Sequence, residues 1–233
     1  MDQGNAVIIG AGSGLSASLA RALHERGHHL VLGARNTDKL AGLASETGAD
    51  TVQIDGSDAD AMQSLFDDLS GPTRVAIYNP SARQRGPIAD LDPETVRRAI
   101  EVTAFGAFLM GQAAARKMLT QDLVDGRRGT ILFTGASAGV KGFPQSAPFA
   151  MGKFAQRGLA QSMARELHPQ GIHVAWVNID GAILNPDPNA WRKEGEDAML
   201  HPDAIAASYM HLIDQHRSAW SEELNLRPWV ETF

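Results

Sequence analysis

The 233-residue chain is 43% hydrophobic and 21% charged, a composition typical of a single globular domain with a sizeable core. It contains no cysteine, so disulfides, thiolate metal sites and cysteine nucleophiles are excluded for these residues. A formal net charge of -6 without a basic run argues against a nucleic-acid partner.

Signals for a membrane or for secretion are also missing from this sequence. No apolar segment approaches the roughly 18 residues that a membrane-spanning helix needs, and Met1 to Gly4 carry no positively charged leader. We therefore expect a cytoplasmic protein without a membrane partner.

Short apolar runs alternate along the chain with amphipathic stretches at helical spacing. The pattern predicts strands at 5–9, 29–32, 50–54, 74–78, 130–134 and 173–179. It predicts helices at 15–26, 37–47, 58–69, 93–115 (as one or two stretches), 148–168 and 204–216. Alternating strands and helices of this length predict an α/β fold with a doubly wound, mostly parallel sheet, which we expect to have about seven strands.

The chain shows no linker that would divide it, so we expect one domain over 1–233. A cofactor half over about 1–135 would precede a substrate-side half over about 136–233. The long irregular segment is 185–200, which is rich in proline and charged residues and is a candidate lid.

A glycine-rich turn, Gly10-Ala-Gly12-Ser-Gly14-Leu-Ser16, joins the first predicted strand to the first predicted helix. Glycines allow the backbone to approach a pyrophosphate, and the N-terminus of the helix directs N–H groups at its oxygens. Glycines also mark plain turns, but between a strand and a helix this cluster predicts a Rossmann-type dinucleotide site. The residues predicted to form it are Gly10, Gly12, Ser13, Gly14 and Leu15.

The end of the second predicted strand bears on the choice of cofactor. It reads Leu32-Gly-Ala-Arg35-Asn36, without the acidic residue that would bind a ribose 2′-hydroxyl. Arg35 can pair with a 2′-phosphate, so the pattern favours NADP(H) over NAD(H). The alternative is that Arg35 only solvates the loop.

These features resemble the short-chain dehydrogenase/reductase (SDR) family over about residues 5–183. The family turn reads Thr-Gly-x-x-x-Gly-x-Gly, and here Ile9 replaces the threonine and Ser16 the last glycine. The resemblance implies that Asp55 meets the adenine ring and that Asn79 braces the central strands.

The resemblance extends to the nicotinamide end of the site. It implies that Gly181 lies near the nicotinamide and that the backbone N–H of Ile183 binds its carboxamide. Asp180 stands just before Gly181, where the family usually has proline.

The catalytic positions of the family are largely replaced in this chain. The family uses Tyr-x-x-x-Lys on one helix, a serine about thirteen residues upstream and an asparagine on the preceding helix. Lys153 matches, but Phe149 replaces the tyrosine, Ala136 the serine and Thr103 the asparagine. The chain is interpreted as an atypical member in which Lys153 binds the ribose or also donates a proton.

Other polar side chains near these positions are candidate catalytic groups. Ser137 adjoins the missing serine, and Asp180 would place a carboxylate near the nicotinamide; each could instead cap a turn. Lys141, Ser146 and His201 are weaker candidates. No metal site is expected.

Three functions remain open from the sequence. The leading hypothesis is an NADP(H)-dependent oxidoreductase of a small-molecule substrate with a non-standard proton relay. The alternatives are an NADP(H)-binding sensor or scaffold without turnover, and a non-redox enzyme on the same fold.

The resemblance also implies a homodimer or homotetramer packed through the helices at 104–118 and 149–168. The aromatic chain end, 219–233, is expected to cover the pocket, to pack on a neighbouring subunit or to pack on its own domain.

Overall fold

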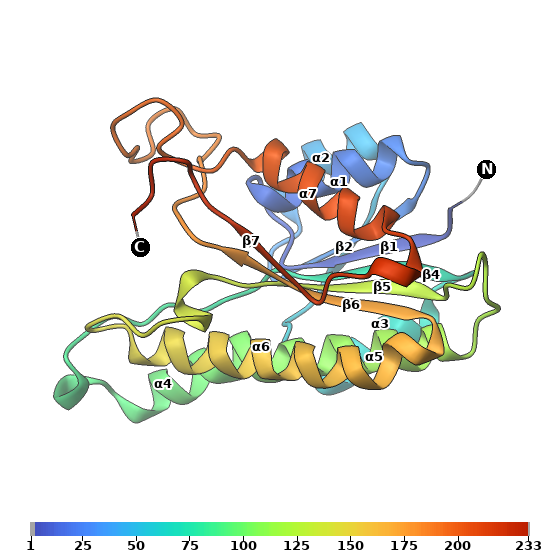
Figure 1. Ribbon diagram of the computed structural model, residues 1–233, viewed down its shortest axis with the longest axis horizontal. Helices are drawn as coiled ribbons and strands as arrows, with labels where there is room; N and C mark the ends of the chain where they lie inside the picture. The colour runs from blue at the N-terminus through green and yellow to red at the C-terminus, as the bar shows by residue number, and fades with distance from the viewer. Residues whose placement is uncertain (1–2, 233) are drawn as a thin grey trace.

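The computed structural model describes residues 3–232 as a seven-stranded sheet between two layers of helices (Figure 1). The strand order is β3-β2-β1-β4-β5-β6-β7, and every neighbouring pair is parallel. The strands are β1 (Asn5–Ile9), β2 (His29–Ala34), β3 (Asp50–Gln53), β4 (Thr73–Tyr78), β5 (Gly129–Thr134), β6 (Ile172–Ile179) and β7 (Glu223–Leu226). The predicted single, doubly wound α/β domain is confirmed.

The helices cover both faces of the sheet. One face carries α1 (Leu15–Glu25), α2 (Ala41–Thr47) and α7 (Pro202–Asp214). The other carries α3 (Ala59–Asp68), α4 (Pro93–Ile100), α5 (Gly106–Leu119) and α6 (Ala147–Leu167). None of the described helices is both long and apolar enough to cross a membrane.

The strand β1 shows why the sequences of the central strands are continuous apolar runs. Val7 and Ile9 belong to the core under α3, α5 and α6, whereas Ala6 and Ile8 belong to the core under α1 and α7. Successive side chains of a strand point to opposite faces, so a strand covered on both sides needs apolar residues throughout.

The predicted helix at 93–115 is interrupted. A π-helix at Glu101–Phe105 joins α4 to α5, and α5 begins at Gly106. A Cβ atom at Gly106 would lie 2.1 Å from the Tyr78 hydroxyl oxygen, so the glycine lets α5 approach β4 closely. Single π-helical turns inside helices are frequent at functional sites.

The seventh strand lies in the chain end, which the periodicity left without an assigned element. β7 pairs with β6 from Trp176 and Glu223 to Ile179 and Leu226 at the edge of the sheet. An edge strand is only half covered, so it lacks the continuous apolar run that marks the central strands.

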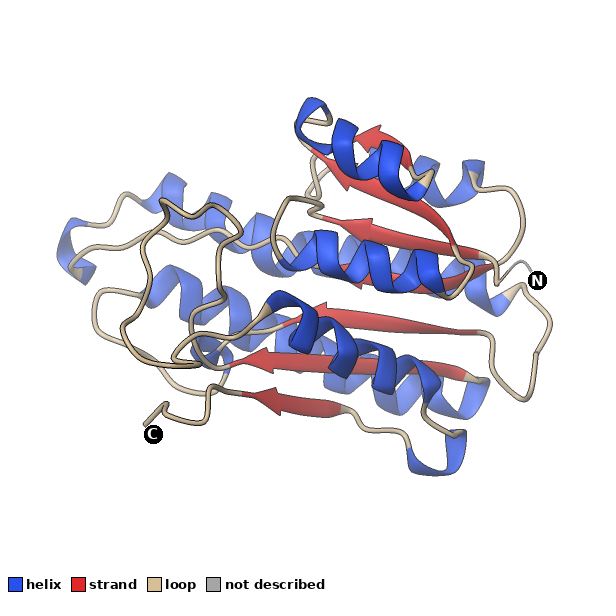
Figure 2. Ribbon diagram, turned by 90° about the horizontal axis from the view of Figure 1, so that it is seen from above, coloured by secondary structure: helices blue, strands red, loops and turns tan. Residues whose placement is uncertain are grey.

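All strands end at the same edge of the sheet, where the long loops gather (Figure 2). The strand order reverses between β1 and β4, and ligands of open α/β sheets bind in the crevice at such a point. The segment 185–200 forms no helix or strand, and a bridge between Ile183 and Leu200 holds its base.

Candidate cofactor and substrate site

The turn after β1 has the geometry of a phosphate cradle. Gly10 has a φ of +82°, and a Cβ atom there would lie 2.7 Å from the Pro80 ring, so only glycine fits. At Gly12 and Gly14 an added Cβ atom would meet no atom within 4 Å. The turn therefore leaves open space in front of the N-terminus of α1, where backbone N–H groups attract anions.

Ser16 and Asn79 tie this turn to the neighbouring strand. The Asn79 side-chain amide donates to Ser16 Oγ at 2.7 Å, and Ser16 Oγ donates to the Gly10 carbonyl oxygen at 3.0 Å. The backbone N–H of Asn79 donates to the Ile9 carbonyl oxygen at 3.0 Å. Ser16 thus links the glycine turn to Asn79 by hydrogen bonds and does more than replace a glycine. Its small size alone did not indicate this role.

A cavity of about 280 Å³ brings most of the predicted phosphate and carboxamide contacts together. Its wall also includes the base of the segment 185–200, through Asn185 and Pro186. The predicted site residues that line it are Gly10, Gly12, Ser13, Gly14, Leu15, Asn79 and Ile183.

A neighbouring cavity of about 330 Å³ holds the predicted 2′-phosphate and adenine contacts, Arg35 and Asp55. Lys39, in the short 3-10 helix Asp38–Leu40, lines the same cavity. Within residues 3–232, neither Arg35 nor Lys39 has an ion pair. Lys39 was missed by the sequence reasoning, although it follows Arg35 by four residues.

Asp55 is held as an ionised carboxylate. Its Oδ1 accepts hydrogen bonds from the backbone N–H of Ser57 at 3.0 Å and from Ser57 Oγ at 2.7 Å. Its Oδ2 forms an ion pair with Arg98. These hydrogen bonds, together with the charge of Arg98, lower the pKa of Asp55. Its predicted contact with an adenine ring remains a prediction.

Lys153 lies on α6 with only 1% of its surface exposed. Its Nζ donates to the Thr134 carbonyl oxygen at 2.5 Å and to Gln156 Oε1 at 3.2 Å. Burial, with a smaller effect of the Arg83 charge, lowers the pKa of Lys153 to about 7. The amine can therefore gain or lose a proton near neutral pH.

Gln156 connects Lys153 to two further elements. Its Nε2 donates to the Thr103 carbonyl oxygen at 3.3 Å in the π-helix, and its Oε1 accepts from Trp176 Nε1 at 3.3 Å in β6. Gln156 was not singled out from the sequence, where the available signal was its place three residues after Lys153 on the same helix.

The candidate base Asp180 is engaged by the chain end. Arg227 donates to Asp180 Oδ2 from Nε at 3.0 Å and from Nη2 at 2.5 Å. Asp180 therefore anchors the segment after β7 instead of facing the cavity as a free carboxylate. Its neighbour Gly181 packs against the same segment, since a Cβ atom there would lie 2.7 Å from the Pro228 ring.

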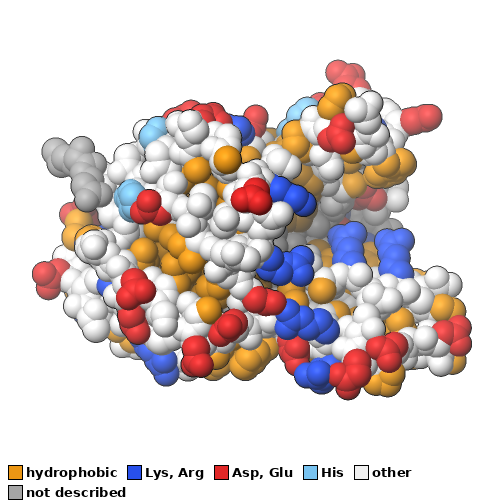
Figure 3. Space-filling model, turned by 180° about the vertical axis from the view of Figure 1, so that it is seen from behind, with side chains coloured by type: hydrophobic (Ala, Val, Ile, Leu, Met, Phe, Trp, Pro, Cys, Tyr) orange, Lys and Arg blue, Asp and Glu red, His pale blue; other side chains and the backbone are white. Residues whose placement is uncertain are grey.

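A third cavity, of about 580 Å³, opens beside Gly181 and Phe149. Ser137 and Asp180 line it as well, together with the weaker candidates Lys141 and Ser146, whereas Lys153 and His201 do not. The space-filling view shows a cleft on this part of the molecule with Lys and Arg side chains along it (Figure 3). The chain end contributes Glu231 and Thr232 to its wall, so this segment both packs on its own domain and covers the cavity.

Comparisons with known proteins agree with this geometry. Residues 4–184 match the sequence profile of the family described as short chain dehydrogenase. The chain belongs to the short-chain dehydrogenase family.

Individual short-chain dehydrogenases and related proteins match over most of the chain. An uncharacterized oxidoreductase of Staphylococcus aureus (strain N315) is 26% identical over 96% of each chain. Sorbitol-6-phosphate 2-dehydrogenase of Escherichia coli (strain K12) is 27% identical over 78% of this chain and 72% of its own.

Solved structures of the family superpose closely. A short-chain dehydrogenase from Rhodopseudomonas palustris has a TM-score of 0.81 and 33% identity, covering 97% of this chain and 99% of that one. A metagenomic short-chain oxidoreductase in complex with NADP has a TM-score of 0.82 and 25% identity, covering 97% of each chain. Together these findings support a nicotinamide dinucleotide as the cofactor.

Three residues that we expect to replace the family's catalytic side chains, Phe149, Ala136 and Thr103, lie on or beside α6. Phe149 lies one helical turn before it and packs against Ala136 and Ala138 in a small apolar cluster. Thr103 is fully buried, and its Oγ1 accepts a hydrogen bond from the backbone N–H of Ala82 at 3.0 Å. Phe149 and Ala136 therefore contribute to apolar packing, and Thr103 holds the loop that contains Ala82.

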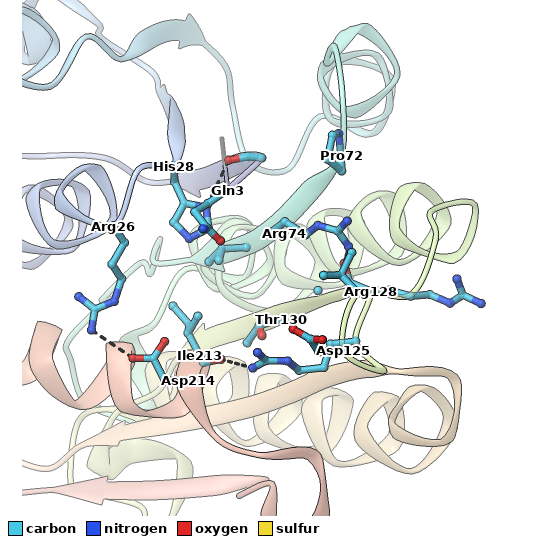
Figure 4. A pocket seen from close by; sticks show the side chains of 15 residues that line it. Gln3, Arg26, His28, Pro72, Arg74, Asp125, Arg128, Thr130, Ile213 and Asp214 are labelled. Carbon is cyan, nitrogen blue, oxygen red and sulfur yellow. Dashed lines mark hydrogen bonds and ion pairs between the residues drawn. The ribbon is translucent and has the colours of Figure 1, made fainter. Parts of the chain in front are cut away.

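A further cavity, of about 450 Å³, lies near the amino ends of β1, β4 and β5, away from the glycine turn (Figure 4). Its basic residues are engaged within the protein. Arg26 pairs with Asp214 at 3.2 Å, Arg74 Nη1 donates to the Arg128 carbonyl oxygen at 2.8 Å, and Arg127 Nη1 donates to the Ile213 carbonyl oxygen at 3.0 Å. The described residues contain no cluster of three or more acidic or histidine side chains that could hold a metal ion.

Proposed function

We propose that this protein is an NADP(H)-dependent oxidoreductase of a small-molecule substrate in which protons are not delivered by a tyrosine. The observation that carries the proposal is the open glycine cradle, in which Gly12 and Gly14 face unfilled space at the N-terminus of α1. Ile183 lines that cradle and Gly181 lines the adjoining third cavity, so a cofactor bound in the cradle would reach the substrate cavity. When bound, NADPH would supply a hydride.

The preference for NADP(H) over NAD(H) rests on the second cavity. Arg35 and Lys39 line it without an acidic partner, and two cations suit a 2′-phosphate. The carboxylate in that cavity, Asp55, is already paired with Arg98. The NADP complex of the metagenomic relative supports the same choice.

Proton transfer in this chain must follow another route than the family's. Phe149 has no hydroxyl, and Lys153 lies buried one turn further along α6. Arg83 lies over the Phe149 ring, with its guanidinium carbon 4.4 Å from the ring centroid. We infer that the charge of Arg83 favours negative charge on the bound substrate, while Lys153 or water supplies the proton.

This arrangement favours substrates that need little acid catalysis. General acid catalysis contributes roughly 100- to 10,000-fold, so simple ketones should be reduced slowly. An activated alkene such as an enone depends less on a proton donor in the transition state, whereas the charge of Arg83 would disfavour a cationic iminium substrate. A panel of enones, imines and carbonyl compounds, followed by NADPH oxidation, tests this preference.

Rebuilding the family's relay provides the decisive test. Phe149 and Ala136 pack in one cluster, so Phe149→Tyr with Ala136→Ser should place two hydroxyls side by side. We expect the double variant to gain roughly 100-fold in ketone reduction. The matched control is Phe149→Tyr with Ala138→Ser, which adds a hydroxyl to the same cluster at another position. If both variants bind NADPH and neither gains ketone activity, the proposed departure from the family mechanism is wrong.

The second candidate function is an NADP(H)-binding sensor or scaffold. It is favoured by the apolar cluster of Ala136, Ala138 and Phe149 beside an open cofactor cradle. This candidate predicts tight NADPH binding without NADPH oxidation across the panel. A non-redox enzyme has less support, because its candidate base Asp180 is bonded to Arg227.

We also propose that the chain forms a homodimer or homotetramer through α5 and α6. Large apolar side chains are exposed on and beside these helices: Phe105, Phe108, Met151 and Phe154. Sedimentation of the wild type against Phe108→Glu with Phe154→Glu tests this interface, and an unchanged mass would contradict it.

A further inference from the structure

The cavity beside Phe149 carries positive charges that form no ion pair with any residue the structure describes. Its wall contains Arg83, Arg85 and Lys141, and of these side chains none forms a hydrogen bond or an ion pair within residues 3–232. Burial, with a smaller effect of the Arg85 charge, lowers the pKa of Arg83, so its charge is held there at a cost that a bound anion would offset. Like charges gathered around a cavity favour an oppositely charged ligand.

The acidic residues of the same wall do not balance these cations, because each has a partner outside the wall. Asp180 is bonded to Arg227, and Glu231 pairs with Lys193 at 2.9 Å. The carboxylates are therefore already neutralised, and the three cations of the wall are left for a bound group.

The cofactor does not account for these cations either. Its phosphates are assigned to the glycine turn and to Arg35 with Lys39, which line the two neighbouring cavities. The wall of the third cavity shares no residue with either of them. The charges at Arg83, Arg85 and Lys141 are thus available to a ligand other than the cofactor, in the cavity that we take to be the substrate site.

Two contacts hold the cations at the cavity. Arg83 lies over the Phe149 ring, and Lys141 Nζ lies 5.5 Å from the ring centroid of Phe143, which positions both charges next to apolar surface. The backbone N–H of Gly86 donates to the Gln145 carbonyl oxygen at 3.2 Å and joins the loop of the arginines to the loop of the lysine.

The backbone at Gln145 supports the view that this wall is built for binding. Gln145 has a φ of +57°, a left-handed conformation that is unfavourable for a residue other than glycine. Such strained residues cluster at ligand sites, where the surrounding structure holds them in place.

From these observations we propose that the cavity binds its substrate through an anionic group, a carboxylate or a phosphate ester, held by Arg83, Arg85 and Lys141. The rings of Phe143 and Phe149 would contact an apolar body attached to that group. A cavity of about 580 Å³ suits a small metabolite of this kind. The inference rests on the proposed function, because it takes this cavity to be the substrate site.

Binding, rather than turnover, tests the inference. The protein is first saturated with NADP⁺, so that anions cannot occupy the cofactor site, and is then titrated calorimetrically with benzoate, phenyl phosphate and neutral benzamide. We expect benzoate, phenyl phosphate or both to bind and benzamide to bind at least 10-fold more weakly. The more tightly bound anion identifies the carboxylate or the phosphate as the recognised group.

Charge removal then locates the site. Arg83→Gln with Lys141→Gln should weaken anion binding at least 10-fold, whereas Arg26→Gln, in the cavity at the opposite edge of the sheet, should leave it unchanged. Equal binding of benzamide and the anions, no binding of any probe, or equal anion binding by wild type and the double variant would overturn the inference. Anion binding without any NADPH oxidation would support the inference while counting against the proposed oxidoreductase.

Discussion

Replacing Lys153 by methionine should change how the stability of the cofactor-free protein depends on pH. The Lys153 amine is buried on α6, and its polar contacts are the Thr134 carbonyl oxygen and Gln156 Oε1. Methionine keeps an unbranched chain of similar length and removes the titrating group. Comparing the wild type with Lys153→Met therefore measures the effect of the proton on Lys153 Nζ alone.

The expected size follows from the pKa of Lys153, which burial lowers from 10.5 to about 7. Between these values the unfolded chain holds a proton that the folded protein has lost, so raising the pH stabilises the wild type. The free energy of unfolding of the wild type should rise by at most about 1.4 kcal/mol per pH unit from this group. Between about pH 8 and 9.5 the rise amounts to about 2 kcal/mol. The hydrogen bond to Thr134 favours the charged amine and makes this value an upper bound.

Urea denaturation of both proteins at several pH values measures this effect. The difference between the wild type and Lys153→Met in the free energy of unfolding removes the contribution of all other titrating groups. Phe149→Leu, one turn earlier on α6, is the matched control, because it changes packing without removing a proton. Parallel profiles for the wild type and Lys153→Met would refute the reasoning and show that the buried amine keeps its proton.

Two further substitutions test the cofactor site and the chain end. Arg35→Ala should weaken NADPH binding roughly 10- to 100-fold, because a charged hydrogen bond to the 2′-phosphate is lost. NADH binding should change little. Fluorescence titrations measure both affinities, and equal losses for the two cofactors would contradict this role. Arg227→Met should destabilise the protein by about 3–5 kcal/mol, because it leaves Asp180 buried without its partner. The matched control Arg21→Met breaks an exposed pair with Glu46 and should lower the melting temperature far less in the same thermal melts.

Features set by neighbouring residues were predictable from the sequence. The strand Asn5–Ile9 was predicted with its observed ends, because a continuous apolar run stops at a glycine whose positive φ the structure requires. The residues around that turn share one cavity for the same reason, since a strand, a turn and a helix fix their positions locally.

Features that depend on distant segments could not be predicted in this way. Gln156 resembles any polar helical residue until β6 and the π-helix bring Trp176 and Thr103 against it. The sequence allowed Asp180 to be predicted as a candidate base, because nothing in it indicates that Arg227, 47 positions further along the chain, is its partner. The strand β7 depends on pairing with β6 and shows no periodicity of its own strong enough to identify it.

The arrangement of the carboxyl edge is compatible with the proposal that an open cofactor cradle accompanies a catalytic centre without a tyrosine. The cradle is formed by the turn after β1 and braced from β4 through Asn79 and Ser16. The centre around Lys153 is formed by α6, the π-helix, the end of β5 and Trp176 of β6, and among residues 3–232 no hydrogen bond joins this centre to the glycine turn. A change of the side chain at position 149 should therefore leave the cradle intact, so NADPH binding alone would not distinguish the proposed oxidoreductase from a sensor. The anion site proposed at the third cavity bears on that distinction, because a protein that only senses NADP(H) would not need a second anion site next to the cofactor cradle.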